Sequence, residues 1–197
     1  IGWMTERLSD RIEIVGLVDV NKEVLKEQGA KLGLGGDQLF TDYEEACSKV
    51  QADFCGIATP PQFHAPQAIA AMGAGMPVIC EKPMAVGMGL ADEMVAACDE
   101  SGTKLVISHQ RRFTPGWEKA RELVQGGAIG QVMQAVSKVN AGLLNCGTHA
   151  IDGVRFILGD PETQWVMGAV ERQSERFERD TPIEDGCMAL VRAVQCF

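Results

Sequence analysis

A lysine directly after a short apolar run is the first residue whose position suggests chemistry. Glu81, Lys82 and Pro83 follow the run 77–80, which has the composition of a buried strand. Lysine is uncommon at such a strand end, and its ammonium group in a partly desolvated cleft can hydrogen-bond a substrate oxygen. There it would lower the pKa of a hydroxyl that is about to lose hydride. The alternative is a solvated Glu–Lys pair ahead of a turn. Pro83 restricts the local backbone, and the sequence leaves both the cis and the trans isomer of its peptide bond open.

A histidine near the start of a predicted helix is the second candidate. The helix is predicted over 148–158, so that His149 and Asp152 lie three residues apart on one face. A helix N-terminus favours the neutral imidazole, which is the form that accepts a proton from an alcohol at physiological pH. The alternative is a structural histidine with no part in catalysis.

Two more strand ends carry distinctive residues. Asp19 ends the first apolar run, where a dinucleotide-binding fold uses an acidic side chain to bind the adenosine ribose hydroxyls and to repel a 2′-phosphate. That position favours NAD over NADP, although Asp19 could also simply end a strand. The segment 59–64, which contains Thr59, Pro60 and His64, follows the next long strand. Its prolines expose backbone carbonyls at a strand end, or merely begin a helix.

These residues need a scaffold, and the sequence predicts an alternation of strands and helices. In open parallel sheets ligands bind beyond the carboxyl ends of the strands, where these candidates lie. The alternation predicts a doubly wound α/β sheet, with nearly all-apolar strands that helices cover on both faces. The predicted strands are 12–18, 53–59, 77–80 and 104–108, and the predicted helices are 22–32, 42–50, 60–74, 87–100 and 115–125.

The pattern changes after Gly130, and we expect a domain boundary near residue 128. Residues 1–128 would form a dinucleotide-binding domain, and 129–197 the start of a second domain that is too small to be complete. In the second part we expect strands over 131–139, 164–170 and 186–194 around the helix that carries His149. The charge-rich segment 171–180 alternates in sign and is interpreted as a solvated connection.

Composition and charge exclude several classes of function. The chain has 197 residues, of which 46% are hydrophobic, and a net charge of −9, so that nucleic acid and anionic membranes are poor partners. No apolar run reaches the roughly 20 residues that span a bilayer, and we expect a cytoplasmic protein. The cysteines are odd in number and the closest two, Cys47 and Cys55, are too far apart for a C-x-x-C pair, so neither a metal site nor a disulfide framework is predicted.

Five short motifs together resemble one known family. In this order and at these spacings they are similar to the glucose-fructose oxidoreductase / inositol dehydrogenase (Gfo/Idh/MocA) family. The motifs occupy residues 18–21, 58–64, 80–85, 109–113 and 147–152. Each is weak alone, but Glu-Lys-Pro after a buried strand with Gly-Thr-His-x-x-Asp downstream is fairly specific.

The resemblance implies a Rossmann domain that binds NAD(P), followed by part of an α+β substrate domain whose open sheet forms the interface of a homo-oligomer. It implies hydride transfer between nicotinamide and a hydroxyl or carbonyl of a sugar, cyclitol or related small molecule. Lys82 would orient the substrate oxygen and His149 would be the general acid/base. The implied cofactor-binding residues are Asp19, Thr59, Pro60, His64, Glu81 and Lys82, and the implied substrate-binding residues are Arg112, Asn145, Asp152 and His149.

The chain departs from the family pattern in two respects. Many members carry an aspartate four residues before the histidine, whereas this chain has Asn145, and an amide cannot act as a base. The Gly-rich loop is not found, the connection at 140–142 is short, and members are longer at the C-terminus, so we expect a member truncated at both ends. Two alternative functions stay open: NAD-dependent cleavage of a glycosidic bond without net redox, and a non-catalytic remnant of the fold that binds a ligand.

Overall fold

The chain forms two compact units. The computed structural model describes residues 7–178 and 181–194. The first unit comprises residues 1–80 and 87–106, and the second comprises 81–86 and 107–197. We predict from the sequence that a cofactor-binding part ends and a substrate-binding part begins near residue 128. This functional division stays a prediction.

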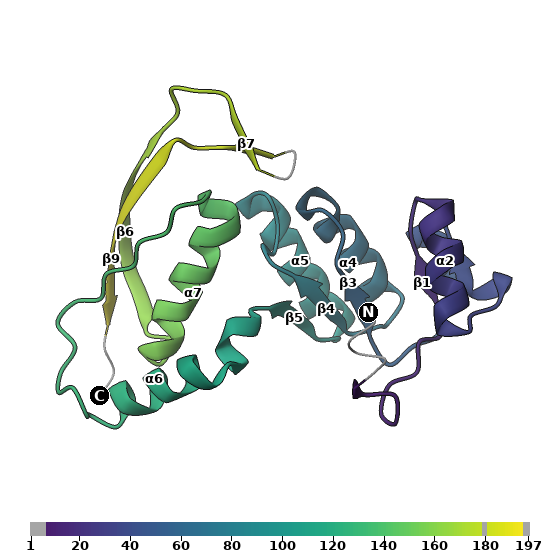
Figure 1. Ribbon diagram of the computed structural model, residues 1–197, viewed down its shortest axis with the longest axis horizontal. Coiled ribbons are helices and arrows are strands. Elements are labelled where there is room, and N and C mark those ends of the chain that lie inside the picture. Colours follow the sequence, from purple (N-terminus) through teal and green to yellow (C-terminus); the bar gives the residue numbers. More distant parts are fainter. Residues whose placement is uncertain (1–6, 179–180, 195–197) are drawn as a thin grey trace. The chain divides into compact units, whose positions relative to one another are not determined.

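The first unit alternates strands and helices, as Figure 1 shows. In chain order the elements are β1 (Leu17–Val18), α2 (Lys22–Leu32), β2 (Leu39–Phe40), α3 (Tyr43–Lys49), β3 (Cys55–Ile57), α4 (His64–Gly73), β4 (Val78–Glu81), α5 (Met88–Ser101) and β5 (Leu105–Ser108). β1 pairs with β2 and β3 with β4, both in parallel, and β5 completes a sheet of order β3-β4-β5. The predicted α/β alternation with a parallel sheet is confirmed.

Local signals explain where the first helix begins and ends. The side chain of Asn21 accepts hydrogen bonds from the backbone N–H groups of Glu23 and Val24, at 3.0 and 3.2 Å, which caps the start of α2. Gly33 ends the helix with φ at 72°, a left-handed conformation that glycine adopts without strain. The bounds of α2 therefore follow from the sequence alone.

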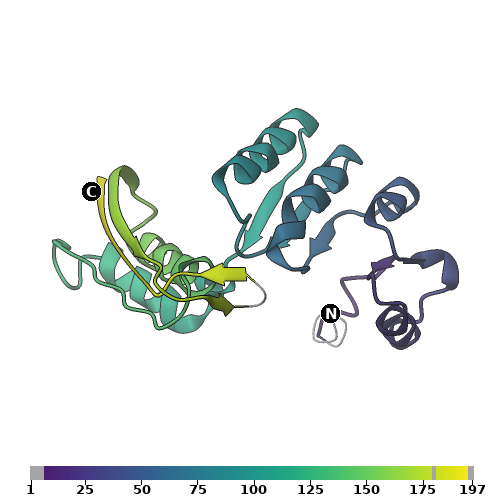
Figure 2. The same cartoon turned by 90° about the horizontal axis from the view of Figure 1, so that it is seen from above.

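The core of the first unit lies between the β3-β4-β5 sheet and the helices α4 and α5, which pack side by side (Figure 2). Ala68 and Met72 of α4 are fully buried, and so is Cys80 of β4. The neighbouring Ile79 is 43% exposed, so β4 alternates between a buried and an open face. The expectation that helices bury these strands on both faces is therefore wrong for β4, because α4 and α5 cover the same side.

The first strand is shorter than predicted. The sequence predicts a strand over 12–18, but only Leu17–Val18 is a strand in the structure. Its partner β2 is itself two residues long, and a strand extends only as far as a neighbouring chain supplies backbone hydrogen bonds.

The second unit combines two helices with antiparallel strands. Its elements are a 3₁₀ turn (Gln110–Phe113), α6 (Pro115–Gln125), a π-helical turn (Leu143–Gly147), α7 (Thr148–Ile157), β6 (Glu162–Glu171), β7 (Arg176–Glu178), β8 (Thr181–Ile183) and β9 (Gly186–Val194). β6 and β9 form a long two-stranded ribbon, and β7 and β8 form a short hairpin (Figure 1). The predicted helix at α7 and the predicted strands at β6 and β9 are confirmed.

Two predictions for the second unit need correction. Residues 131–139 form no strand, because none of the strands in the described part of the chain pairs with them and most of their side chains are exposed. The segment 171–180, interpreted as a solvated connection, contains β7, and its last two residues lie outside the described ones. Partial alternation of apolar and polar residues therefore does not produce a strand where no neighbouring strand is available for pairing.

Helices α6 and α7 cross at a glycine. A Cβ atom built on Gly153 of α7 would lie 2.2 Å from the ring of Trp117 in α6. Glycine in a helix interior lowers helix stability by about 1 kcal/mol relative to alanine. Gly153 offsets this cost because its lack of a Cβ atom allows α6 and α7 to approach closely.

We predict that Gly153→Ala destabilises the second unit by about 1–3 kcal/mol, because the added methyl group forces the indole out of its place. Urea unfolding followed by tryptophan fluorescence measures this change. The matched control is Gly89→Ala in α5, where a Cβ atom meets nothing within 4 Å. The control should be neutral or slightly stabilising, and equal effects of the two substitutions would contradict the packing argument.

Candidate active site

Lys82 lies at the end of β4 in a buried position. Its side chain is only 9% exposed, and the Lys82–Pro83 peptide bond is cis. The ammonium Nζ donates a hydrogen bond to the side-chain oxygen Oδ1 of Asn145 at 2.6 Å, and lies 3.4 Å from the backbone oxygen of the same residue. A residue predicted from a strand end is thus joined to one from the turn before α7.

His149 lies in the first turn of α7 and is 7% exposed. The hydroxyl of Thr148 donates to the backbone oxygens of Leu144 and Asn145, which ties the helix start to the preceding turn. The ring nitrogen Nδ1 of His149 is buried and has no hydrogen-bond partner within residues 7–178 and 181–194. Burial lowers the pKa of His149 below its usual value, and the positive charge of Lys82 lowers this pKa further.

Arg112 and Asp152 form a hydrogen-bonded ion pair in the site. The guanidinium Nε donates to both carboxylate oxygens of Asp152, at 2.9 and 3.1 Å, and Nη2 donates at 2.6 Å. The other side of the same guanidinium donates to the two carboxylate oxygens of Asp160, at 3.0 and 2.9 Å. The family resemblance implies that Arg112 and Asp152 bind substrate, but in the structure each already has a protein partner.

His109 is a site residue to which sequence analysis assigned no role. Its Nδ1 lies 3.5 Å from a carboxylate oxygen of Asp152, and its ring meets that of His149 edge-on with centroids 6.3 Å apart. Burial lowers the pKa of His109, which the charge of Asp152 partly opposes. A signal was present in the sequence, since His109 directly follows a strand at the edge where ligands bind.

Glu178 is the second residue that sequence analysis missed. One of its carboxylate oxygens, Oε1, accepts a hydrogen bond from the side-chain nitrogen of Asn145 at 2.5 Å. Glu178 ends β7, within the charged segment interpreted as a solvated connection. No local sequence pattern predicts the contact of Glu178 with Asn145, because 33 residues separate the two along the chain.

The remaining predicted residues lie in the first unit, except Glu81. Asp19 directly follows β1, and its Oδ1 accepts a hydrogen bond from the backbone N–H of Asn21 at 2.8 Å. Thr59 and Pro60 form the turn after β3, and Nε2 of His64 lies 2.8 Å from the backbone oxygen of Thr59. His64 is only 1% exposed, so it can shape this turn but has almost no surface for contact with a ligand.

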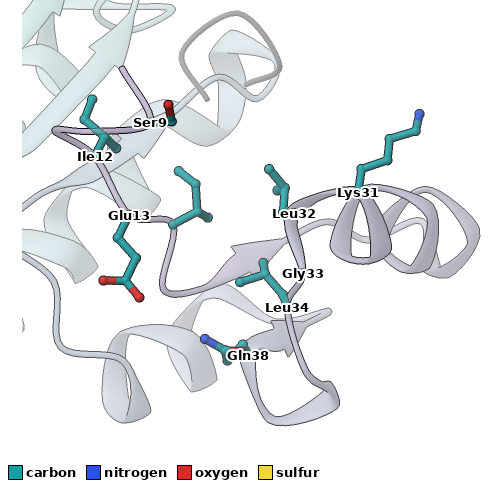
Figure 3. A pocket seen from close by; sticks show the side chains of 9 residues that line it. Ser9, Ile12, Glu13, Lys31, Leu32, Gly33, Leu34 and Gln38 are labelled. Atoms are coloured by element: carbon teal, nitrogen blue, oxygen red, sulfur yellow. The ribbon is translucent and has the colours of Figure 1, made fainter. Parts of the chain in front are cut away.

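An open pocket of about 410 Å³ lies beside the C-terminal end of α2, and none of the predicted site residues lines it (Figure 3). Its lining mixes apolar side chains with Glu13 and Lys31, and Lys31 pairs with Glu27 at 2.7 Å. Within the described residues, no group of His, Cys, Asp and Glu side chains could hold a metal ion, and no helix could cross a membrane.

The geometry of the second unit suits proton handling at an oxygen. Lys82 supplies a buried cationic donor, and His149 supplies an imidazole whose lowered pKa keeps it neutral at physiological pH. A cation stabilises negative charge that develops on an oxygen, and a neutral imidazole accepts the proton that leaves it. The arrangement can therefore interconvert a hydroxyl and a carbonyl when a hydride acceptor is supplied.

Two curated relatives are enzymes of sugar and cyclitol chemistry by name. The chain is 30% identical over 168 residues to a D-apiose dehydrogenase from Paraburkholderia graminis, covering 77% of this chain and 44% of that protein. It is 30% identical over 131 residues to an inositol 2-dehydrogenase from Rhodococcus jostii, covering 66% of this chain and 36% of that protein. The chain thus spans less than half of the length of either relative.

A solved structure and a family model agree with this similarity. The WlbA dehydrogenase from Bordetella pertussis, solved with NADH and UDP-GlcNAcA, is 25% identical and superposes with a TM-score of 0.79 over 98% of this chain and 59% of that one. The model of the Gfo/Idh/MocA family, described as an oxidoreductase family with an NAD-binding Rossmann fold, matches residues 3–109. The resemblance predicted from the five motifs is confirmed, and the chain belongs to the Gfo/Idh/MocA oxidoreductase family.

Proposed function

We propose that the chain is part of an NAD-dependent oxidoreductase that transfers hydride between nicotinamide and a hydroxyl or carbonyl of a carbohydrate-like small molecule. One observation carries the proposal: two buried titratable side chains, Lys82 and His149, lie in the same compact unit, and the charge of Lys82 acts on the imidazole of His149. The sugar and cyclitol names of the relatives support the substrate class.

In the proposed reaction the chain's own residues position the substrate and move one proton. Lys82 donates a hydrogen bond to the substrate oxygen, where its charge favours the alkoxide that precedes hydride loss. His149 takes the hydroxyl proton, and we assign this step to Nε2 because Nδ1 is buried among protein atoms. A bound nicotinamide supplies the hydride acceptor. In the reverse direction His149 returns the proton.

The residues of the first unit fit the adenosine end of NAD. Asp19 directly follows β1, and no cation pairs with its carboxylate in the described part of the chain. A carboxylate in that place accepts hydrogen bonds from ribose hydroxyls and repels a 2′-phosphate. Thr59 and Pro60 would face the cofactor at the next strand end, with His64 holding their turn, and Glu81 would lie beside Lys82 at the end of β4.

We assign Arg112 and Asp152 to positioning rather than to direct substrate contact, because each holds the other.

A second copy of the chain is the partner that we propose for the β6–β9 ribbon. Trp165 and Met188 on this ribbon are 47% and 74% exposed, and an open sheet with exposed apolar side chains needs cover.

We predict that Lys82→Ala lowers kcat by a factor of about 10² to 10³, because a donor that stabilises developing charge is lost. Lys104→Ala, which removes an exposed lysine, is the control.

The amount of NADH formed per molecule of product separates the proposed function from the two alternative functions. Turnover that needs NAD but accumulates no NADH would favour bond cleavage without net redox, and absence of NAD binding would favour a non-catalytic remnant.

We predict that Asp19→Ser lowers the preference for NAD over NADP by about tenfold or more, since the repulsion of a 2′-phosphate disappears. Titration of each nucleotide, followed by fluorescence or calorimetry, gives the ratio of the two Kd values. Asp53→Ser is the matched control, because Asp53 is exposed and precedes β3 instead of following a strand. An unchanged ratio in Asp19→Ser would remove Asp19 from the cofactor site.

A further inference from the structure

The amide of Asn145 bridges two charged side chains. Its oxygen Oδ1 accepts from Nζ of Lys82 at 2.6 Å, and its nitrogen Nδ2 donates to Oε1 of Glu178 at 2.5 Å. The three side chains come from the end of β4, the turn before α7 and the end of β7. The hairpin of β7 and β8 is thereby joined to the candidate active site.

Only one orientation of this amide satisfies both neighbours. A lysine ammonium can only donate hydrogen bonds, and an ionised glutamate can only accept them. Rotation of the amide by half a turn would place its NH₂ group against the ammonium of Lys82 and its oxygen against the carboxylate of Glu178. Both contacts would then be repulsive, so that Glu178 fixes the end of the amide that Lys82 meets.

An aspartate at this position would not have this requirement. Both ends of a carboxylate are acceptors, and its charge would pair directly with the lysine. Asn145 is neutral and asymmetric, so that its orientation must be set by another residue. In this chain that residue is Glu178, at the end of β7.

The hairpin is held close to the turn before α7 by further contacts. A Cβ atom on Gly142 would lie 2.9 Å from the side chain of Ile183 and 3.0 Å from Oε2 of Glu178, so the hairpin packs directly on this glycine. The backbone N–H of Leu143 also donates a hydrogen bond to the carboxylate of Glu184. Glu178 therefore meets Asn145 from an element that is itself docked.

We propose that Glu178 is a positioning residue of the active site: it orients the amide of Asn145 so that the amide oxygen faces Lys82. The assignment to catalysis rests on the proposed function, whereas the orientation of the amide does not. The structural alternative is that Glu178 merely helps to dock the hairpin.

The test compares Glu178→Ala, Glu178→Gln and the control Glu175→Ala, which removes an exposed carboxylate from the same segment. NMR measures hydrogen exchange of the Asn145 side-chain NH₂ group and of the Leu143 backbone N–H. We expect exchange at Asn145 to be at least about tenfold faster in Glu178→Ala, the factor that one hydrogen bond provides. Glu178→Gln, whose amide oxygen can still accept, should restore most of the protection, and the control should match the native chain.

Two results would overturn the proposal. One is unchanged exchange at Asn145 in Glu178→Ala. The other is equal acceleration at Asn145 and Leu143 in both Glu178 variants, which is the signature of simple undocking of the hairpin. Turnover supplies a separate readout, in which kcat should fall in Glu178→Ala and recover in Glu178→Gln. Absence of turnover in every variant would count against the proposed function and leave the amide result standing.

Discussion

The candidate active site depends on the ion pair between Arg112 and Asp152. The guanidinium is shared between Asp152 and Asp160, and it joins the turn after β5 to the middle of α7 and to the residues that follow this helix. Because Asp152 lies one turn after His149 on the same helix, fixing one side chain also fixes the rotation of the other about the helix axis. Removing Arg112 would leave the partly buried carboxylate of Asp152 without its guanidinium partner, which is why we regard this pair as the structural basis of the site.

Charge balance explains the protonation states of the site. His109 and His149 both have a lowered pKa, mainly through burial, with Lys82 acting on both in the same direction. Burial and the neighbouring ammonium group thus both favour the neutral form of the two imidazoles. The carboxylates of Asp152 and Glu178 keep this positive charge tolerable, one through Arg112 and the other through the amide of Asn145.

The sequence predicted what depends on local signals. Lys82 and His149 were found because they follow a strand and begin a helix, and the bounds of α2 and α6 follow from their caps and a proline. The partners of Arg112 and Asn145 were not predictable, since they lie 33 to 63 residues away and meet only after folding. The absence of a strand at 131–139 has the same cause, because pairing partners are tertiary features that periodicity does not contain.

The central claim is that Lys82 and His149 share one electrostatic site, and the pKa of His149 measured by NMR tests it most directly. The chain has 3 histidines, and comparison with His149→Gln assigns the signal. Lys82→Met should raise the pKa of His149, because the charge that lowers it is gone, whereas Lys119→Met on the exposed face of α6 should leave it unchanged. A pKa of His149 that does not rise in Lys82→Met would contradict the account.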